Sequence, residues 1–374
     1  MYSERPMALL FASLALRIAA AAQCLSGGIN FSTQAVIDDF AIANPGCTEI
    51  LGEVTIQGAN ITNLQGLAQV ERFSGGLSIS NCTQLASLNG LENTTTIDFL
   101  QISNCDALTD LSGLDGLTTI SSFVQIRQNA LLAHLYGLEA LQSIEGFVQI
   151  ENNDALLDLA GLSSLASINS FVQIQNDPQL ESLDGPDVLT AIGGYLQISS
   201  NPVLTDLSGL SSLQNISSFL QISNNNTLAS IHGLEGLDPT SFSLLTLTSC
   251  PSLSQCAIES VCTYLDGTGQ RAISGNAPGC ASVAEVQTAC LTFGLDEHLA
   301  TPLTLFPNPA HGSVRVDGIV ATTPVEIVDG LGVLVGRRTL SSASVLDVRD
   351  LAPGVYVLRS NDHGASVNVR LIIE

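Results

Sequence analysis

Apolar positions recur with two different spacings inside a unit of about 24 residues that repeats from Val54 to Cys250. At the start of one unit, Val124 and Ile126 alternate with Gln125 and Arg127, which is the two-residue period of a strand with one buried face. The next apolar residues are three apart, and this period fits neither an α-helix nor a strand: Leu132, Leu135, Leu138, Leu141, Ile144 and Phe147. Each unit therefore predicts one strand followed by irregular turns that keep a common side inward.

Units of this length cannot bury their apolar face alone and must stack on one another. The predicted strands start at Val54, Leu77, Leu100, Val124, Val148, Val172, Leu196, Leu220 and Leu245. Because stacked strands lie about 4.8 Å apart, these nine rungs would form a rod of roughly 40 Å. The predicted fold class is mainly β, a right-handed β-solenoid of about nine rungs with short helical caps, followed by a small antiparallel β-sandwich.

A polar column lies five residues after each strand start, where the chain must turn inward. Its members are Cys82, Cys105, Asn129, Asn153, Asp177, Asn201, Asn225 and Cys250. An Asn amide both donates and accepts, so it can satisfy the backbone of its own turn and of the next rung. Cysteine tolerates burial and can replace it. A glycine column around Gly137 predicts a corner with positive φ or close backbone approach, and Pro186 interrupts the leucine column beside it.

Two outward columns are candidate binding features. Gln101, Gln125, Gln149, Gln173, Gln197 and Gln221 form one, with Arg127 and Glu151 beside it. This column can be a polar recognition strip, a ladder of amides bonded from rung to rung, or both. An aromatic column consists of Phe99, Phe123, Phe147, Phe171, Tyr195 and Phe219. Strand alternation places it outward, where it would suggest binding, whereas the three-residue period turns it into the core, and we favour the core.

The nine cysteines concentrate at the ends of the repeats, which agrees with an exported protein. We predict a Cys24–Cys47 bond and two bonds among Cys256, Cys262, Cys280 and Cys290, whose pairing the sequence leaves open. Cys82 and Cys105 lie on neighbouring rungs and could bond, but two buried thiols are favoured. A zinc site at the four C-terminal cysteines is the rival interpretation, although their spacings include no C-x₂-C pair.

Composition narrows the function further. The formal charge is -24 and every basic residue is arginine, so nucleic acid and anionic membrane surfaces would be repelled. Residues 1–22 have the basic end, apolar run and small residues of a signal peptide, with Cys24 as a less favoured lipidation site. No other stretch is long and apolar enough for a membrane helix. We find no catalytic signature, no cofactor motif and no metal-ligand cluster, and the five histidines are scattered, so an enzyme is not expected.

From residue 303 onward, short alternating strands predict the antiparallel sandwich, as at Val314 and Val316. The tail also contains five short motifs in order: Phe306 to Ala310 with Gly312 (including Pro307, Asn308 and Pro309), Val325 to Asp329 with Gly332, Leu346 to Val348 with Leu351, Gly354 to Tyr356, and Arg370 to Glu374. In these motifs the tail resembles the type A C-terminal sorting domain of the type IX secretion system. The resemblance implies export by the type IX machinery, removal of the tail, and attachment to the surface or release.

Three features of the repeats form a second pattern: rungs such as Tyr195 to Ile198, the asparagine column and the run Leu207 to Leu210. In these features the repeats with their caps resemble the receptor L domain, a β-helix related to leucine-rich repeats. In that family the sheet face can carry ligand binding, but no ligand residue transfers to this chain.

The predicted organisation is a signal peptide (1–22), an N-terminal cap with a helix at 33–43 (23–51), the β-solenoid (52–250), a disulfide-rich cap (251–293), a linker (294–302) and the sorting domain (303–374). The predicted function is binding or adhesion to an extracellular protein or polysaccharide by a secreted or outer-membrane-attached protein of a Gram-negative bacterium. A purely structural surface or matrix protein is the alternative, and an accessory module of a secreted hydrolase is a weaker one.

Overall fold

The chain separates into two compact units, Met1–Cys290 and Leu291–Glu374. The computed structural model describes residues 22–292, 304–317, 323–329, 333–341, 344–362 and 365–374. The predicted signal peptide, apart from Ala22, and the predicted linker lie outside the described residues.

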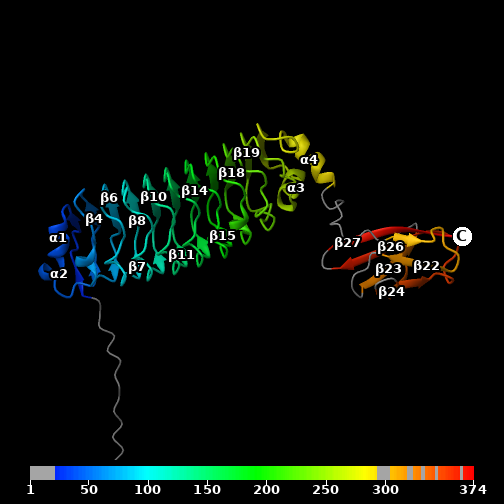
Figure 1. Ribbon diagram of the computed structural model, residues 1–374, viewed down its shortest axis with the longest axis horizontal. Helices are drawn as coiled ribbons and strands as arrows, with labels where there is room; N and C mark the ends of the chain where they lie inside the picture. Colours follow the sequence, from blue (N-terminus) through cyan, green and yellow to red (C-terminus); the bar gives the residue numbers. More distant parts are fainter. Residues whose placement is uncertain (1–21, 293–303, 318–322, 330–332, 342–343, 363–364) are drawn as a thin grey trace, which may run out of the picture. The chain divides into compact units, whose positions relative to one another are not determined.

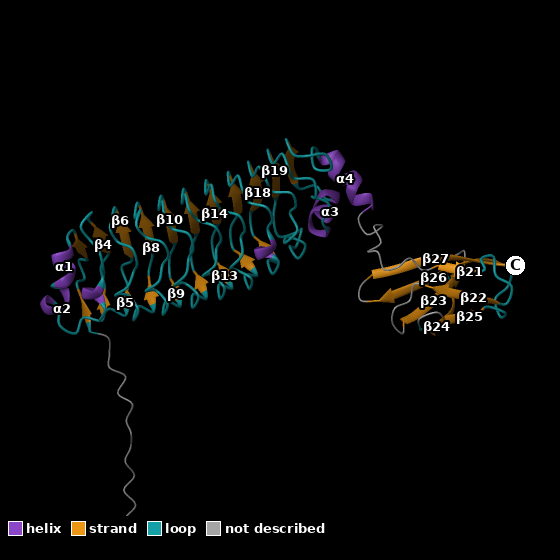
Figure 2. Ribbon diagram, in the orientation of Figure 1, coloured by secondary structure: helices purple, strands orange, loops and turns teal. Residues whose placement is uncertain are grey.

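The first unit is a β-solenoid with two parallel sheets along its length (Figures 1 and 2). The eleven-stranded sheet contains, in spatial order, β2 (Ile29–Phe31), β4 (Val54–Gln57), β6 (Leu77–Ser80), β8 (Leu100–Ser103), β10 (Val124–Arg127), β12 (Val148–Glu151), β14 (Val172–Gln175), β16 (Leu196–Ser199), β18 (Phe219–Ser223), β19 (Leu244–Thr248) and β20 (Gln270–Ser274). The nine-stranded sheet contains β1 (Gln23–Cys24), β3 (Glu49–Ile50), β5 (Arg72–Phe73), β7 (Thr96–Ile97), β9 (Thr119–Ile120), β11 (Ser143–Ile144), β13 (Ser167–Ile168), β15 (Ala191–Ile192) and β17 (Asn215–Ile216).

Equivalent residues of successive units pair directly. Val124 lies opposite Val148, and Val148 opposite Val172, with the rest of each strand in the same register. The predicted β-solenoid is therefore confirmed, and its columns are real neighbours in space. The two-residue strands of the second sheet were not predicted, because the three-residue period around them indicated coil only.

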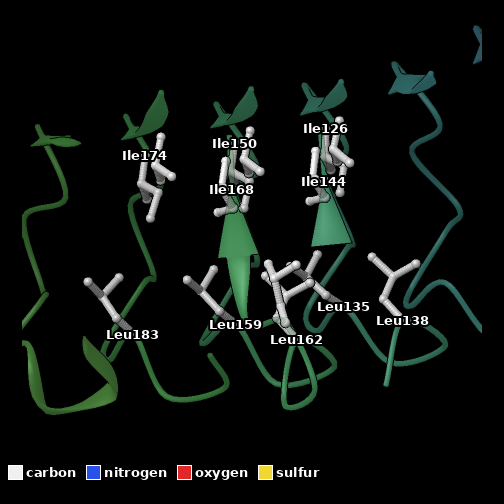
Figure 3. Close-up of a cluster of buried hydrophobic side chains, with 14 of the residues drawn as sticks. Ile126, Leu135, Leu138, Ile144, Ile150, Leu159, Leu162, Ile168, Ile174 and Leu183 are labelled. Carbon is white, nitrogen blue, oxygen red and sulfur yellow. The ribbon is translucent and has the colours of Figure 1, made fainter. Parts of the chain in front are cut away.

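The core is one continuous stack of aliphatic side chains between the two sheets. Figure 3 shows Ile126 and Ile150 from neighbouring rungs of the longer sheet near Ile144 and Ile168 of the shorter one, with the leucines of the turns closing the core. These four isoleucines are at most 3% exposed. A fully buried aliphatic side chain contributes on the order of 1.5–3 kcal/mol, so stacking of neighbouring rungs is the main source of stability.

The polar column forms a hydrogen-bonded chain through the interior, which we call the asparagine ladder. The backbone N–H of Asn129 donates to Asn153 Oδ1 at 3.3 Å, and that of Asn153 donates to Asp177 Oδ1 at 2.8 Å. The ladder also reaches Asn276 in the C-terminal cap, whose Oδ1 accepts from the Cys250 N–H at 3.0 Å. Its members are Cys82, Cys105, Asn129, Asn153, Asp177, Asn201, Asn225, Cys250 and Asn276.

The glycine corner depends on close backbone approach. Gly137 has φ 105°, and a Cβ added there would lie 2.2 Å from the Leu111 carbonyl oxygen of the preceding rung. Any side chain would therefore push the two rungs apart. In the neighbouring column, Pro186 replaces leucine and borders a small apolar cavity of about 20 Å³.

Both ends of the solenoid carry short helices. At the first rungs lie α1 (Gln34–Asp38) and α2 (Phe40–Ala43), two short helices where one was predicted, and at the last rungs lie α3 (Glu259–Asp266) and α4 (Val283–Thr292). Two 3-10 turns, η1 (Gln65–Leu67) and η2 (Ser208–Leu210), replace ordinary corners. The caps also contribute β2 and β20, which extends the longer sheet beyond the nine predicted strands.

Three disulfides fasten these caps. The bonds are Cys24–Cys47, Cys256–Cys280 and Cys262–Cys290. The structure thus selects one of the three pairings that the sequence left open at the C-terminal end. Cys82, Cys105 and Cys250 are buried free thiols within the ladder, so Cys82 and Cys105 form no disulfide with each other, as we favoured from the sequence.

The second unit consists of two antiparallel sheets around a separate core. One sheet contains β21 (Thr304–Phe306), β22 (Ser313–Asp317) and β25 (Ser344–Asp347). The other contains β24 (Leu334–Leu340), β23 (Thr323–Asp329), β26 (Gly354–Asp362) and β27 (Ala365–Ile373). On β26 the side chains of Tyr356 and Leu358 are buried, whereas that of Val355 is 41% exposed. The residues of this strand that face the core are therefore Tyr356 and Leu358, and not its valines.

Candidate binding face

The outer face of the eleven-stranded sheet brings the candidate binding residues together. Gln125 and its equivalents occupy the second position of each central strand and point away from the core, between two buried aliphatic residues. All six glutamines are half-buried by their neighbours on adjacent rungs: Gln101, Gln125, Gln149, Gln173, Gln197 and Gln221. They form a straight row because the strands pair in register.

The central glutamine amides are hydrogen-bonded from rung to rung. Gln125 Nε2 donates to Gln149 Oε1 at 2.6 Å, and Gln149 Nε2 donates to Gln173 Oε1 at 3.1 Å. Gln173 Nε2 lies 3.5 Å from Gln197 Oε1, at the limit of a hydrogen bond. The ladder interpretation therefore describes the central rungs. Gln173 Nε2 also donates to Gln175 Oε1 at 3.0 Å and so uses both of its N–H groups, whereas Gln125 and Gln149 each keep one N–H for another partner.

The next outward column contains the two charged residues of the predicted face. Glu151 accepts a hydrogen bond from Gln175 Nε2 at 2.7 Å. Among the described residues, the Arg127 side chain makes no ion pair or hydrogen bond, and its Nε is shielded from water without an acceptor. The other two arginines of the solenoid are occupied, Arg72 by Glu49 and Arg271 by two backbone carbonyls. Arg127 therefore offers an unused cationic donor on this face.

The aromatic column lies outside the core, contrary to the position that we favoured from the sequence. None of its six side chains belongs to the buried core cluster, and all are half-buried. Consecutive rings stack face to face with centroids 4.4–5.0 Å apart and planes within 6° of each other. Each ring covers much of its apolar surface against the neighbouring rings, so the column is stable without being buried in the core.

The stacking fixes which part of each ring is available. Because neighbouring rings cover each other's faces, the column presents ring edges along its exposed side. At one end, Phe99 covers Gly76, where a Cβ would lie 2.2 Å from the ring. At the other end, Phe219 is followed by the half-buried Leu244. The aromatic, glutamine and Arg127 columns together are called the aromatic–amide face below.

This face differs electrically from the rest of the solenoid. Among its three columns on the six central rungs, only Arg127 and Glu151 carry charges. Acidic side chains are instead frequent at the turns, where Asp115, Glu139 and Glu235 accept hydrogen bonds from glycine N–H groups of the corners. A nearly neutral face on an acidic body is the depletion of charge that protein interfaces show in their centres.

The three histidines in the described part of the chain form no second site. His134 stacks on Tyr136 and lies 3.0 Å from Asp158, His232 contacts Glu235, and His311 lies 3.3 Å from Glu374. In the described part of the chain, no three His, Cys, Asp or Glu side chains converge on a point that could hold a metal ion.

The sorting-motif residues join distant parts of the second unit. Asn308 Nδ2 donates to the Arg370 carbonyl oxygen, and the Ile372 N–H donates back to Asn308 Oδ1, both at 2.8 Å. Tyr356 Oη donates to the Ala352 carbonyl oxygen at 2.8 Å, and Gly354 begins β26. Pro307 and Pro309 flank Asn308 in the segment that follows β21.

Comparison with protein families identifies this second unit. Residues 304–374 match the secretion system C-terminal sorting domain. The tail is a sorting domain. The match lies within the C-terminal unit. No curated protein matches the chain.

The sorting domain supports secretion through the type IX system and a location outside the cell or at its surface. Among the residues that the structure describes, none of the helices combines the length and apolar character needed to cross a membrane.

Proposed function

We propose that this exported protein binds an extracellular protein or polysaccharide through the aromatic–amide face of its solenoid. The observation that supports this proposal best is the column of six stacked aromatic rings that remains outside the core, beside a row of amides. A large apolar surface that the fold itself does not bury usually marks a site of interaction.

The face is ordered before any ligand arrives. Neighbouring rings and hydrogen-bonded amides hold one another in a single arrangement. Binding to such a surface loses little side-chain entropy, which otherwise reduces affinity by about 0.5–1.5 kcal/mol for each immobilised side chain. Aromatic residues and arginine are also the types that contribute most to binding energy at interfaces.

The chemistry of the face favours certain ligands. Ring edges carry the positive side of the aromatic quadrupole and suit oxygen-rich or aliphatic neighbours, the glutamines offer hydrogen bonds, and Arg127 suits a single anionic group. Because one ring and one amide recur per rung, an extended polymer or a flat protein surface would use several rungs at once.

The proposed relation of the repeats to the receptor L domain agrees with binding through a sheet face. Under this proposal the type IX machinery is the partner of the tail, and the solenoid is the part that remains attached to the surface or is released. Nucleic acid is not a proposed ligand, because the described solenoid between residues 24 and 290 contains only three arginines among many acidic residues.

A glycan and protein array probed with the mature full-length chain would identify ligands. Gln149→Glu with Gln173→Glu adds two charges to the centre of the face, and we expect at least tenfold weaker binding, about 1.4 kcal/mol. Ser143→Glu with Ser167→Glu adds the same charges to the nine-stranded sheet on nearby rungs and should leave binding unchanged. Equal losses in both double variants would contradict the proposed face.

A purely structural role is the second candidate, because regular rows of amides and rings can also pair with another copy of themselves. A matrix protein would self-associate and show no saturable ligand, and the same face variants would then abolish self-association. The absence of enzymatic activity stays a prediction, which a hydrolase screen of the purified protein would test.

A further inference from the structure

Asp177 is the one carboxylic acid in the asparagine ladder, and it is fully buried. Its Oδ1 accepts hydrogen bonds from the backbone N–H and the side-chain Nδ2 of Asn153, at 2.8 and 3.2 Å. Its own N–H donates to Asn201 Oδ1 at 3.0 Å. These are the contacts that an asparagine makes at the same position, so one oxygen of Asp177 replaces the amide oxygen. The other oxygen, Oδ2, is buried without a partner.

The neighbouring rungs show which contact is missing at Oδ2. In each of them the side-chain Nδ2 donates to the carbonyl oxygen of the inward isoleucine that lies 27 residues earlier. These bonds are Asn129 to Ile102 (3.3 Å), Asn153 to Ile126 (3.1 Å), Asn201 to Ile174 (3.2 Å) and Asn225 to Ile198 (3.0 Å). The thiols of Cys82 and Cys105 likewise point at the carbonyls of Ile56 and Ile79. The same offset leads from Asp177 to Ile150, whose carbonyl oxygen an ionised carboxylate would face without a proton between them.

We infer that Asp177 binds a proton on Oδ2 and donates it to the Ile150 carbonyl oxygen, so that a neutral carboxylic acid completes the ladder. The proton comes from solvent as the rungs close, and no other group changes its charge. A protonated carboxyl has one donor and one acceptor oxygen, and it therefore reproduces both contacts of the asparagine amide.

The surroundings of Asp177 favour the neutral form. Burial raises its pKa to about 7, and the hydrogen bonds from Asn153 oppose this shift only in part. Glu151 at the end of β12 and the exposed Asp154 raise the pKa further by repulsion. The ladder residues on both sides, Asn153 and Asn201, carry no charge, and Arg127 lies two rungs away, about 10 Å at the spacing of stacked strands.

Proton binding couples the stability of the solenoid to pH. An unfolded aspartate has a pKa of about 3.9, so between about pH 4 and 7 the folded chain holds a proton that the unfolded chain releases. The stabilisation is complete below about pH 4, decreases as pH rises, and is lost above about pH 7. This dependence is opposite to that of an ion-paired aspartate.

Urea unfolding of the full chain at several pH values, with Asp177→Asn as the partner variant, tests the inference. The amide needs no proton, so the ratio of the unfolding constant of the native chain to that of Asp177→Asn should rise about tenfold per pH unit from pH 5 towards 7 and level off above about 8. Asp154→Asn removes a nearby exposed charge but leaves the ladder intact, and it should keep the pH dependence of the native chain.

The site can also be moved along the ladder. Asn225→Asp in the Asp177→Asn background should restore the pH dependence, because Asn225 makes the same two kinds of contact. If Asp177→Asn fails to fold, infrared spectra of the native chain still test whether Asp177 is protonated. The band of a protonated carboxylic acid should be present at pH 5 and disappear on titration through about pH 7. Absence of that band, or identical pH dependence of the native chain and Asp177→Asn, would overturn the inference.

Discussion

The solenoid and the sorting domain organise their contacts over very different distances along the chain. In the solenoid, a residue meets its equivalent in the next unit, as Asn129 meets Asn153. In the sorting domain, Asn308 is bonded to Arg370 and Ile372 near the opposite end of the unit. A destabilising substitution in one rung of the solenoid should therefore affect only the neighbouring rungs, whereas the sorting domain should fold or unfold as a whole.

The two units also differ in charge. Six of the eleven arginines lie between residues 304 and 374, and only three lie between residues 24 and 290. In the sorting domain arginines pair with carboxylates on the surface, as Arg337 does with Glu326. The solenoid is therefore acidic with few cations, whereas the surface of the sorting domain carries both signs of charge.

Removing residues 304–374 should have the largest effect, because it removes the matched sorting domain. We expect surface export to be lost completely and the solenoid to accumulate inside the cell envelope. Cell fractionation with an antibody to the solenoid measures this, and protease resistance of the retained protein shows whether the solenoid has folded. Normal export of the truncated chain would show that the signal for export does not lie in the C-terminal unit.

Asn153→Leu should have the next largest effect. The substitution leaves the Asn129 N–H and the Ile126 carbonyl without their partner, and each buried unsatisfied group costs about 1–3 kcal/mol. We expect the free energy of unfolding of the solenoid to fall by about 4 kcal/mol in chemical denaturation. Asn308→Leu, at an exposed site in the sorting domain, should lower the free energy of unfolding of that domain by about 1 kcal/mol. Equal losses for the two substitutions would show that burial does not decide how much an asparagine contributes to stability.

Loss of the Cys256–Cys280 bond through a double alanine substitution should cost about 3 kcal/mol. Because each rung contacts only its neighbours, the rate of amide hydrogen exchange should increase in β19 and β20 and remain unchanged around β8. Uniform acceleration across the solenoid would mean that it unfolds as one block.

Pro186→Leu should have the smallest effect, and it should be stabilising. Pro186 borders the small apolar cavity and lacks the N–H by which Leu162 donates to Leu159 in the equivalent place. Filling the cavity and restoring that bond should add about 1 kcal/mol to the free energy of unfolding. Leu162→Pro is the reverse control, and it should destabilise by a similar amount or more.

Much of the solenoid follows from the sequence, because the repeat makes each residue type appear many times in one environment. The positions that escaped prediction are those where two periods meet or where the repeat length changes. Phe147 satisfies both the outward strand period and the inward three-residue period, and only the stacking of its neighbours decides between them. Asn276 follows Cys250 by 26 residues, so the 24-residue unit did not identify it as a ladder member.

The candidate face was predictable in part. The glutamine row and the neighbouring Arg127 were identifiable, since strand alternation places them outward. The free guanidinium of Arg127 and the unpartnered oxygen of Asp177 were not, because they depend on which side chains of adjacent rungs reach one another. The cysteine pairing at the C-terminal cap likewise required coordinates.

The in-register pairing of successive rungs has a consequence for how such a chain changes over time. A duplication of residues 148–171 would place valine on valine, glutamine on glutamine and ring on ring, since these rows already match on both sides. The gene could thus lengthen or shorten the aromatic–amide face by whole repeats, because the same contacts would form at both ends of the inserted unit.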